Sequence, residues 1–514
     1  MRKISRPMVY KIFISLIIFC IIMIIGNIKS GFHVDEIYTF GLSNHQYNGS
    51  ILPDILEEQN YSGKQLWNEY TTVSREHRFD YENVFVNQEH DVHPPLYYLL
   101  VHTICSFFPE TFSKWMGLFL NAVLAVIVLW QMIWLFNYFV DDKKISLFFG
   151  ILFTLCMGSI NNILFFRMYV LLAVMINALI IFFCKFSPAD NRRIQYPILG
   201  IIVLLGILTQ YYFGIFCFFA CFVYALFLIR EKNWKKFGLC FLTICVDAIC
   251  SLMIFPAMIN HIFFGYRGVN SIDISGNVSL IEKFKTYYRI FNRELFGGFF
   301  IVLIIFTFVL ILYTAKKDKK LNVFKEKNKN YLQIIIPTLL YILLIILITP
   351  YQTDRYVFSI MGLLYVCIFV PIILLLKKYS SRFIWIGGCL AVLMVACSYR
   401  FGIPNAYLGE IDKKEVLENK AAIPCLYIFD SNNSWEVLYN YYDLRELDNI
   451  IFLSSDHLEK LNNEKYKKYD ELIVYISATL DSNNTVSTII NNNDQLDNTE
   501  TLFPVSNVVT YYLE

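Results

Sequence analysis

Apolar segments of membrane-spanning length recur along most of the chain and constrain its fold more than any other feature. They cover residues 9–28, 115–140, 145–163, 168–186, 197–211, 213–229, 237–259, 296–315, 331–349, 356–376 and 383–399. Some are slightly shorter than the roughly 20 residues of a typical transmembrane helix. A chain that is 56% hydrophobic and only 17% charged has more apolar surface than a soluble core can bury. The sequence therefore predicts an α-helical polytopic membrane protein with about eleven transmembrane helices.

Lysine and arginine residues are concentrated in alternate loops, which sets the predicted orientation in the plasma membrane, because short cytoplasmic loops carry the positive excess. The basic segments are "MRKISR", "DDKK", "KFSPADNRR", "REKNWKK", "KKDKKLNVFKEKNK" and "KKYSSR". All of them fall on the cytoplasmic side if residues 93–108 do not cross the membrane. We therefore predict that "HPPLYYLLVHTICSFF" lies along the outer interface and that the loop 29–114 is extracytoplasmic.

The chain divides near residue 400 into a predicted transmembrane domain, 1–399, and a predicted extracytoplasmic α/β domain, 400–514. In the second, "CLYIFD" (425–430), "NIIFLSS" (449–455) and "ELIVYIS" (471–477) are typical of β-strands. Polar, helix-compatible segments separate them, and this alternation predicts parallel strands. The domain could act as a lid, as an acceptor-recognition surface or as a structural cover.

Two adjacent carboxylates follow the first apolar segment. Asp35 and Glu36 lie in "HVDE" beside His33, and a second polar cluster, "QEHDVHPP", contains Asp91 and His93. A carboxylate within hydrogen-bond reach of a substrate hydroxyl can take its proton. Two carboxylates could alternatively hold a divalent cation. A solvated helix end is the purely structural alternative.

Two arginines lie where predicted outer loops meet apolar segments: Arg167 in "FFRMYVLLA" and Arg355 in "TDRYVFSI". Cations at this depth are costly enough to mark a functional site. The planar guanidinium group suits bidentate binding of phosphate, so the two arginines indicate a lipid phosphate, with snorkelling to lipid headgroups as the alternative. The turn "LTQYYFG" contains Gln210 and Tyr211, where an aromatic belt at the membrane interface is the structural alternative.

These motifs occur in the same order as in membrane glycosyltransferases of the GT-C class. The resemblance is carried by "HVDEIYTF", "HPPLYYLLVH", "FRMYVLLA", "TQYYFG" and "DRYVFSIMGLL" over roughly residues 1–375. It is closest to the bacterial branch of glycosyltransferase family 39, the dolichyl-phosphate-mannose protein mannosyltransferases. The chain departs from that family at Gln210, where relatives often have His, and in lacking a proline after the Arg355–Tyr356 pair. The resemblance does not extend beyond residue 400.

The resemblance implies a set of site residues. Asp35, with Glu36 beside it, would activate the acceptor, and Arg167 and Arg355 would bind the lipid phosphate together with Tyr356. The remaining residues expected at the site, including the His-Pro-Pro motif, are His33, Asp91, His93, Pro94, Pro95, Tyr169, Gln210 and Tyr211.

The predicted activity follows from the side of the membrane on which the candidate site lies. Nucleotide sugars are cytoplasmic, so a site outside needs a sugar donor that crosses the membrane on a polyprenyl-phosphate carrier. The sequence thus predicts an inverting hexosyltransferase with Asp35 as base and a protein, wall-polymer or glycolipid acceptor. It indicates no nucleic-acid partner and no definite cofactor, and it leaves open the sugar, a divalent cation and the oligomeric state.

Three other functions compete with this one. A transporter or lipid flippase would use the same membrane segments, although the chain shows no internal inverted repeat. A metal-dependent oligosaccharide transferase would move a preassembled glycan. A non-catalytic scaffold of envelope assembly would need no acidic residue at position 35.

Overall fold

A computed structural model describes most of the chain: residues 6–48, 57, 59–190, 192–265, 278–317, 327–349, 351–379, 381–409, 411–464, 466–493, 495–503 and 508–514. Part of the basic loop 316–329 lies outside these residues. The chain forms two compact units. The first comprises Met1–Asn27, Asp91–Tyr97 and Gly117–Pro404, and the second comprises Ile28–His90, Tyr98–Met116 and Asn405–Glu514. Most of the loop 29–114 therefore belongs to the same unit as the C-terminal residues.

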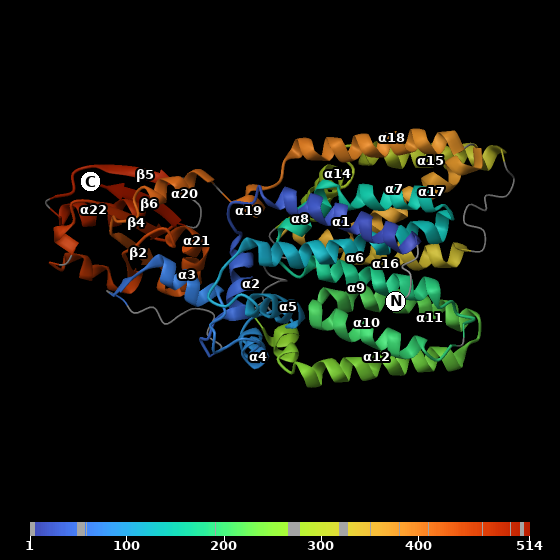
Figure 1. Cartoon of the computed structure of the whole chain (residues 1–514), viewed down its shortest axis with the longest axis horizontal. Helices are drawn as coiled ribbons and strands as arrows, with labels where there is room; N and C mark the ends of the chain where they lie inside the picture. Colours follow the sequence, from blue (N-terminus) through green and yellow to red (C-terminus); the bar gives the residue numbers. More distant parts are fainter. Residues whose placement is uncertain are drawn as a thin grey trace. The chain divides into compact units, whose positions relative to one another are not determined.

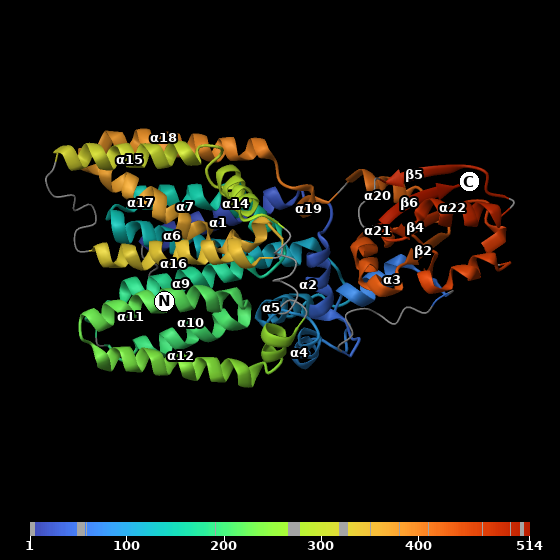
Figure 2. The same cartoon turned by 180° about the vertical axis from the view of Figure 1, so that it is seen from behind.

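The first unit is a bundle in which helices occupy all the predicted apolar segments (Figures 1 and 2). They are α1 (Arg6–Gly26), α6 (Lys114–Val140), α7 (Lys143–Thr154), α8 (Met157–Leu164), α9 (Tyr169–Lys185), α10 (Gln195–Thr209), α11 (Tyr212–Arg230), α12 (Trp234–Ile254), α15 (Phe300–Lys317), α16 (Asn328–Ile348), α17 (Met361–Tyr379) and α18 (Ser381–Ser398). Within the described residues, six helices are long and apolar enough to cross a membrane, or seven if the bent pair α7–α8 forms one span. The predicted class, a multi-pass helical membrane protein, is confirmed.

Some predicted spans differ from a single long helix. The segment 145–163 is broken between α7 and α8 by a bend of 55°. Helices α9 and α10 are apolar but shorter, with 17 and 15 residues. Helix α5 (Leu96–Ser106) has 11 residues, too few to cross a bilayer, as the charge pattern requires of the segment 93–108. Its location along the interface stays a prediction.

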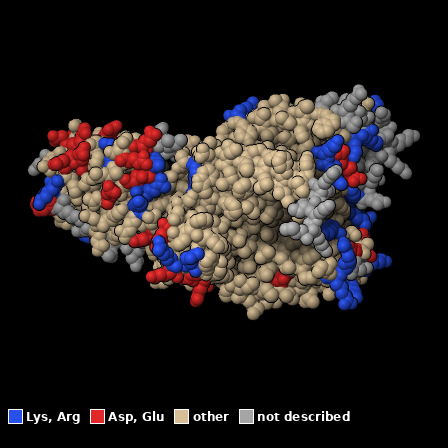
Figure 3. All heavy atoms as spheres, in the orientation of Figure 1, with Lys and Arg blue, Asp and Glu red and all other residues tan. Residues whose placement is uncertain are grey.

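The basic loops of the helical unit, as far as the structure describes them, lie together at one end of the bundle; most of the basic N-terminal segment "MRKISR" lies outside the described residues. Four contacts join them: Lys377 Nζ to the carbonyl oxygen of Val140 (2.8 Å), Lys236 Nζ to that of Asp190 (2.7 Å), Lys329 Nζ to Glu231 Oε1 (2.6 Å), and Lys327 Nζ to the carbonyl oxygen of Tyr138. In Figure 3, blue spheres gather at the right-hand end of this unit, beside a broad surface with few charged atoms. The turns 164–169, 209–212 and 348–361, at the other ends of the same helices, therefore lie at the opposite end.

Helix α1 packs antiparallel to α6. Trp130 Nε1 donates to Ser15 Oγ at 2.8 Å, and the rings of Phe19 and Phe119 meet edge to face with centroids 5.9 Å apart. At the end of α1, a Cβ atom on Gly26 would touch the Leu118 side chain. Because the C-terminal end of α6 lies among the basic loops, α1 ends at the opposite end of the bundle.

The second unit contains a six-stranded mixed sheet with the order β1-β3-β2-β4-β6-β5. Its strands are β1 (Asn60–Tyr61), β2 (Cys425–Phe429), β3 (Ile450–Ser454), β4 (Leu472–Ser477), β5 (Thr499–Phe503) and β6 (Val508–Leu513). Strands β3, β2 and β4 are parallel, which confirms the predicted alternation, and β1, β5 and β6 pair antiparallel. Strands β1, β5 and β6 were not predicted, and the loop 29–114 contributes β1 to the sheet edge.

Hydrophobic cores cover both faces of this sheet. On one face, Tyr427 and Tyr475 pack with Trp67 and Tyr70 of α3 (Gly63–Thr71). On the other face, alternate residues of the same strands pack against α22 (Ser482–Asn491). Further helices complete the unit: α2 (Val34–Asn44), α4 (Tyr81–Glu89), α19 (Asn405–Leu408), α20 (Ile411–Glu418), α21 (Tyr441–Leu444), and the 3₁₀ segments η6 (Ser431–Asn440), η7 (Ser455–Asn462) and η8 (Tyr466–Lys468).

Candidate active site

The first cluster of predicted site residues lies at the start of α2, in the second unit. His33 is the N-cap residue: its Nδ1 accepts a hydrogen bond from the Asp35 backbone N–H at 3.0 Å, and its own N–H donates to Glu36 Oε2 at 2.7 Å. These reciprocal bonds satisfy two backbone donors that the first helical turn would otherwise leave unpaired. His33, Asp35 and Glu36 are thus fixed relative to one another by the helix cap.

Glu36 is held inside the unit by a buried ion pair. Its Oε2 lies 2.9 Å from Lys29 Nζ, and the side chains of Glu36 and Lys29 are 0% and 1% exposed. Lys29 Nζ also donates to the carbonyl oxygen of Tyr407. Burial lowers the pKa of Lys29, while the charge of Glu36 and their hydrogen bond oppose that shift. Glu36 therefore anchors the turn rather than facing a substrate.

Asp35 occupies a different environment from its neighbour. Its side chain is 17% exposed, and Oδ2 lies 3.8 Å from His33 Nδ1. The N-terminal turn of a helix favours a negative charge at this position. Of the two adjacent carboxylates, Asp35 is therefore the one that an acceptor could reach.

The second cluster lies in the helical unit and joins three predicted residues. Asp91 Oδ2 is 2.8 Å from His93 Nδ1, and Arg167 Nη2 is 3.2 Å from His93 Nε2. Because a carboxylate only accepts, His93 Nδ1–H donates to Asp91, while Arg167 Nη2, which is also 3.5 Å from His93 Nδ1, lies over the imidazole ring. His93 is thus held between Asp91 and Arg167, whose side chain is buried at 3% exposure.

Arg355 lies in the short helix η3 (Asp354–Tyr356), next to a pair of carboxyl groups that the sequence analysis missed. The Arg355 backbone N–H donates to Asp354 Oδ1 at 2.9 Å. Glu294, the last residue of α14 (Leu280–Glu294), forms side-chain hydrogen bonds with Asn161 and Asp354. Burial, first, and the charge of Asp354 raise the pKa of Glu294 well above its usual range.

Gln210 and Tyr211 form the turn between α10 and α11. The Gln210 backbone N–H caps α10 by donating to the carbonyl oxygen of Gly206, and the Tyr211 hydroxyl hydrogen-bonds to His261 Nδ1 at 2.8 Å. Burial, and next the charge of Asp91, raise the pKa of Tyr211. His261, in the π-helical turn η1 (Asn260–Phe264), was not predicted.

Tyr169 and Tyr356 are packed among aromatic rings, and each is 4% exposed. Tyr356 meets Tyr212 edge to face at 5.8 Å, and the Arg355 guanidinium lies 5.4 Å from the Tyr356 ring. Tyr169 stacks on Phe165 with centroids 6.0 Å apart. Both tyrosines therefore support the turns that carry the arginines.

Within the described residues, no three His, Cys, Asp or Glu side chains converge in an arrangement that could hold a metal ion. The carboxylates lie in two groups: Asp35 and Glu36 in the second unit, and Asp91, Glu294 and Asp354 in the first.

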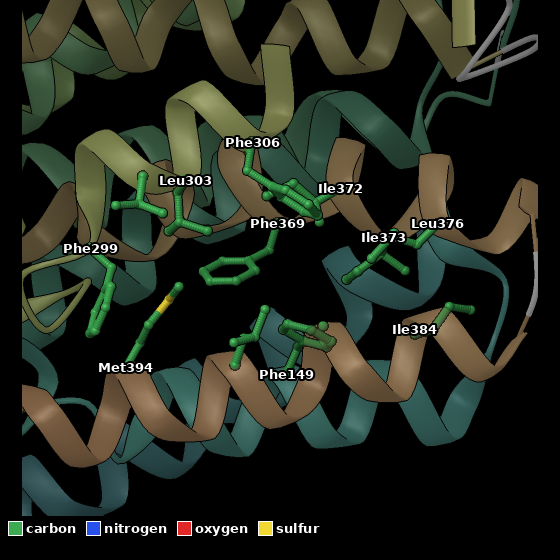
Figure 4. Close-up of a pocket in the computed structure, with 13 residues that line it drawn as sticks. Phe149, Phe299, Leu303, Phe306, Phe369, Ile372, Ile373, Leu376, Ile384 and Met394 are labelled. Atoms are coloured by element: carbon green, nitrogen blue, oxygen red, sulfur yellow. The ribbon is translucent and has the colours of Figure 1, made fainter. Parts of the chain in front are cut away.

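An apolar pocket of about 200 Å³ opens among α7, α15, α17 and α18 (Figure 4). It is lined by Phe149, Phe299, Val302, Leu303, Phe306, Phe369, Ile372, Ile373, Leu376, Ile384, Gly387, Leu390 and Met394. None of these side chains is charged or forms strong hydrogen bonds, and Figure 4 shows Phe149, Phe369 and Met394 facing one another across the space. Such a lining suits a hydrocarbon chain and not a sugar.

Comparison with solved structures identifies the fold. The chain matches ArnT from Cupriavidus metallidurans, solved with undecaprenyl phosphate, over 98% of its own length and 97% of that chain, with a TM-score of 0.54 and 11% identity. The apo state of the same protein gives a TM-score of 0.48 at 11% identity, covering 93% and 96% of the two chains. No family sequence pattern and no curated protein matches the chain. The first of these comparisons shows that the chain has the GT-C fold that its motif order predicts. Its placement in family 39 stays a prediction.

The Archaeoglobus fulgidus oligosaccharyltransferase, solved with zinc and sulfate, is also similar, at a TM-score of 0.41 and 11% identity over 74% of this chain and 59% of that one. This TM-score is too low to support any conclusion about the reaction that the chain catalyses.

Proposed function

We propose that the protein transfers a sugar from a polyprenyl-phosphate-linked donor to an acceptor hydroxyl outside the cytoplasm, with inversion at the anomeric carbon. The observation that carries the proposal is the difference between Asp35 and Glu36: Asp35 is accessible at a capped helix start, whereas Glu36 is neutralised by buried Lys29. The GT-C fold, and the solved structure of similar fold that binds undecaprenyl phosphate, support the lipid-linked donor.

In the proposed reaction, Asp35 takes the proton of the acceptor hydroxyl as its oxygen forms a bond to the anomeric carbon. The bond between that carbon and the donor phosphate oxygen breaks, and the lipid phosphate leaves with the electron pair. A phosphate monoester has a second pKa of about 6, so it needs no protonating acid to leave. A single base and direct displacement imply inversion.

Arg167 and Arg355 stabilise the charge that grows on the departing phosphate. His93 keeps the Arg167 guanidinium oriented, and the raised pKa of Glu294 favours its neutral form, which limits neutralisation of Arg355. The apolar pocket among α7, α15, α17 and α18 offers space to the isoprenoid chain of the donor.

The test is transfer of label from polyprenyl-phosphate sugars to a membrane fraction by the purified protein in proteoliposomes. Asp35→Asn removes the proton acceptor at nearly constant size, so the transfer rate should fall by roughly 100- to 10,000-fold. Glu82→Gln is the matched control, since Glu82 is an exposed carboxylate in the first turn of α4 in the same unit. A near wild-type rate for Asp35→Asn would refute the assignment of the base, and Asp91 would be tested next.

The same proteoliposomes separate this function from its rivals. A flippase would translocate labelled lipid without transferring sugar, and it would tolerate Asp35→Asn. An oligosaccharide transferase would deliver a preassembled glycan rather than one sugar.

A further inference from the structure

The sheet of the second unit has a topological switch point between β2 and β4. Strands β3, β2 and β4 are parallel neighbours, so their carboxyl ends share one edge. The chain leaves β2 towards β3, and it leaves β4 through α22 towards the β5–β6 pair, in the opposite direction across the sheet. Connections that diverge in this way leave a crevice at the carboxyl edge, where ligands of open α/β sheets bind.

Polar side chains occupy this edge and are fixed by hydrogen bonds. Asp430, directly after β2, accepts bonds at 2.9 Å from the side chains of Asn433 and Thr479. Ser477, the last residue of β4, donates to Glu436 Oε2 at 2.8 Å. The edge between β2 and β4 is therefore lined by carboxylate, amide and hydroxyl groups held in fixed positions.

The carboxyl end of the neighbouring strand β3 also carries carboxylate and hydroxyl side chains. Ser431 Oγ donates to Asp456 Oδ1 at 2.9 Å. The basic residues that follow, His457 and Lys460, both pair with Glu57, at 2.8 and 2.9 Å. The described part of this edge thus has an excess of carboxylates, which disfavours a phosphorylated or otherwise anionic ligand.

Two large aromatic side chains are exposed in η6, the segment that follows β2 and carries Glu436. Trp435 is 41% exposed and Tyr439 is 36% exposed, and their ring centroids are 5.6 Å apart. Both belong to η6, and Trp435 directly precedes Glu436, which is bonded to the end of β4. An exposed Trp–Tyr pair next to fixed hydrogen-bonding groups is typical of a binding surface rather than of a folding core.

We propose that Trp435, Tyr439 and the carboxyl edge between β2 and β4 bind a neutral oligosaccharide. The C–H face of a sugar ring is apolar and packs on the electron-rich face of an aromatic ring. Its hydroxyl groups act as donors to Glu436 and Asp430 and as acceptors from Ser and Asn side chains. The inference rests on the proposed function only in identifying this oligosaccharide with the sugar acceptor; the binding itself does not depend on catalysis.

The test measures binding of four neutral tetrasaccharides, made of β-linked glucose, α-linked glucose, mannose or N-acetylglucosamine, to the full chain in lipid nanodiscs. Calorimetry should detect binding of at least one tetrasaccharide with a Kd below about 10 mM. A glycerol phosphate oligomer should bind more weakly than that tetrasaccharide. Trp435→Ala should weaken binding roughly tenfold or more, because the stacking surface is lost. Glu436→Gln should weaken it by a smaller factor.

Asp448→Asn is the matched control, because Asp448 is an exposed carboxylate at the opposite, amino edge of the same parallel strands. It should bind the sugar as the wild type does. Absence of binding by all four tetrasaccharides, or equal binding by Trp435→Ala, would overturn the proposal, as would tighter binding of the glycerol phosphate oligomer. Asp35→Asn should bind normally, so failure of the transfer chemistry and failure of the oligosaccharide site give different results.

Discussion

At the scale of single residues, adjacent carboxylates have separate tasks because of contacts that are remote in sequence. Glu36 is neutralised by Lys29, and Lys29 is held by the carbonyl oxygen of Tyr407, 378 residues further along the chain. Removing one partner of a buried ion pair leaves an uncompensated buried charge, whereas removing both partners leaves no buried charge. This difference can be measured independently of activity.

Glu36→Gln should therefore destabilise the protein by about 3 to 5 kcal/mol, because it leaves Lys29 buried without its counter-ion. The double variant Lys29→Met with Glu36→Gln should recover most of that loss, while the amide oxygen introduced at position 36 can still accept from the His33 backbone. The measurement is thermal unfolding of the purified protein, with Asp35→Asn as the control variant that keeps the ion pair. Equal stability of the single and double variants would show that the pair does not anchor the turn.

Arg355→Lys keeps the positive charge but removes the planar fork that binds phosphate at two oxygens. We expect the apparent KM for the lipid-linked donor to rise by roughly tenfold, equivalent to about 1.4 kcal/mol. Arg75→Lys is a suitable control, since Arg75 is 77% exposed and pairs with Glu110 at the surface. An unchanged donor KM in Arg355→Lys would return Arg355 to a role in anchoring the protein to lipid headgroups.

The sequence indicates the chemical types of these residues better than their individual roles. Asp35 and Glu36 are indistinguishable in "HVDE", because the burial that separates them depends on Lys29 and Tyr407 folding against the same turn. In the sequence, Glu294 is one of several charged residues in a segment with the pattern of an amphipathic helix, "LIEKFKTYYRIFNRE". Only the tertiary fold brings it to Asp354, so no local pattern marks it.

At the scale of elements, long apolar runs and β-rich runs were predictable because burial gives them a strong local signal. The bend between α7 and α8 was not, since "FTLCMGS" contains no proline and its single glycine is inside α8. Strand β1 has two residues and exists only because β3 offers an edge to pair with. Strand β5 comes from the polar segment "TETLF", which lacks a hydrophobic pattern of its own.

The β2–β4 edge should make the second unit sensitive to acid. Hydrogen bonds from Asn433, the Asn432 backbone and Thr479 lower the pKa of Asp430. A carboxyl group whose folded pKa lies below its unfolded value of about 3.9 stabilises the fold above that value, and this contribution is lost as the pH falls through the folded pKa.

Asp430→Asn should therefore speed hydrogen exchange in β2 and β4 at about pH 6, relative to the wild type, and this difference should shrink at about pH 3. Mass spectrometry of peptides spanning 425–430 and 472–477 provides the measurement. Asp448→Asn, at the amino edge, should leave exchange in these peptides unchanged at both pH values. A wild-type to Asp430→Asn difference that is the same at both pH values would contradict the assigned role of Asp430.

At the scale of the whole molecule, charge distribution and the GT-C fold together make the orientation testable. All the described basic loops of the helical unit gather at one end of the bundle, and the turns that carry Arg167, Tyr211 and Arg355 lie at the other. If short basic loops face the cytoplasm, these turns face outward. The need for a lipid-linked donor depends on that orientation, since nucleotide sugars would otherwise be directly available.

Single cysteine substitutions of Lys143, Tyr351 and Lys64 test it, because all three positions are exposed in the structure. Lys143 begins α7 among the basic loops, Tyr351 lies between α16 and η3 at the opposite end, and Lys64 lies in α3 of the second unit. A membrane-impermeant maleimide applied to intact cells should label Tyr351→Cys and Lys64→Cys, and it should label Lys143→Cys only after the membrane is permeabilised. The native cysteines are mostly buried or within membrane helices, so the wild-type chain supplies the background level.

Labelling of Lys143→Cys and Tyr351→Cys from the same side would contradict the arrangement of the bundle across the membrane. Labelling of Lys143→Cys alone in intact cells would invert that arrangement and remove the requirement for a lipid-linked donor.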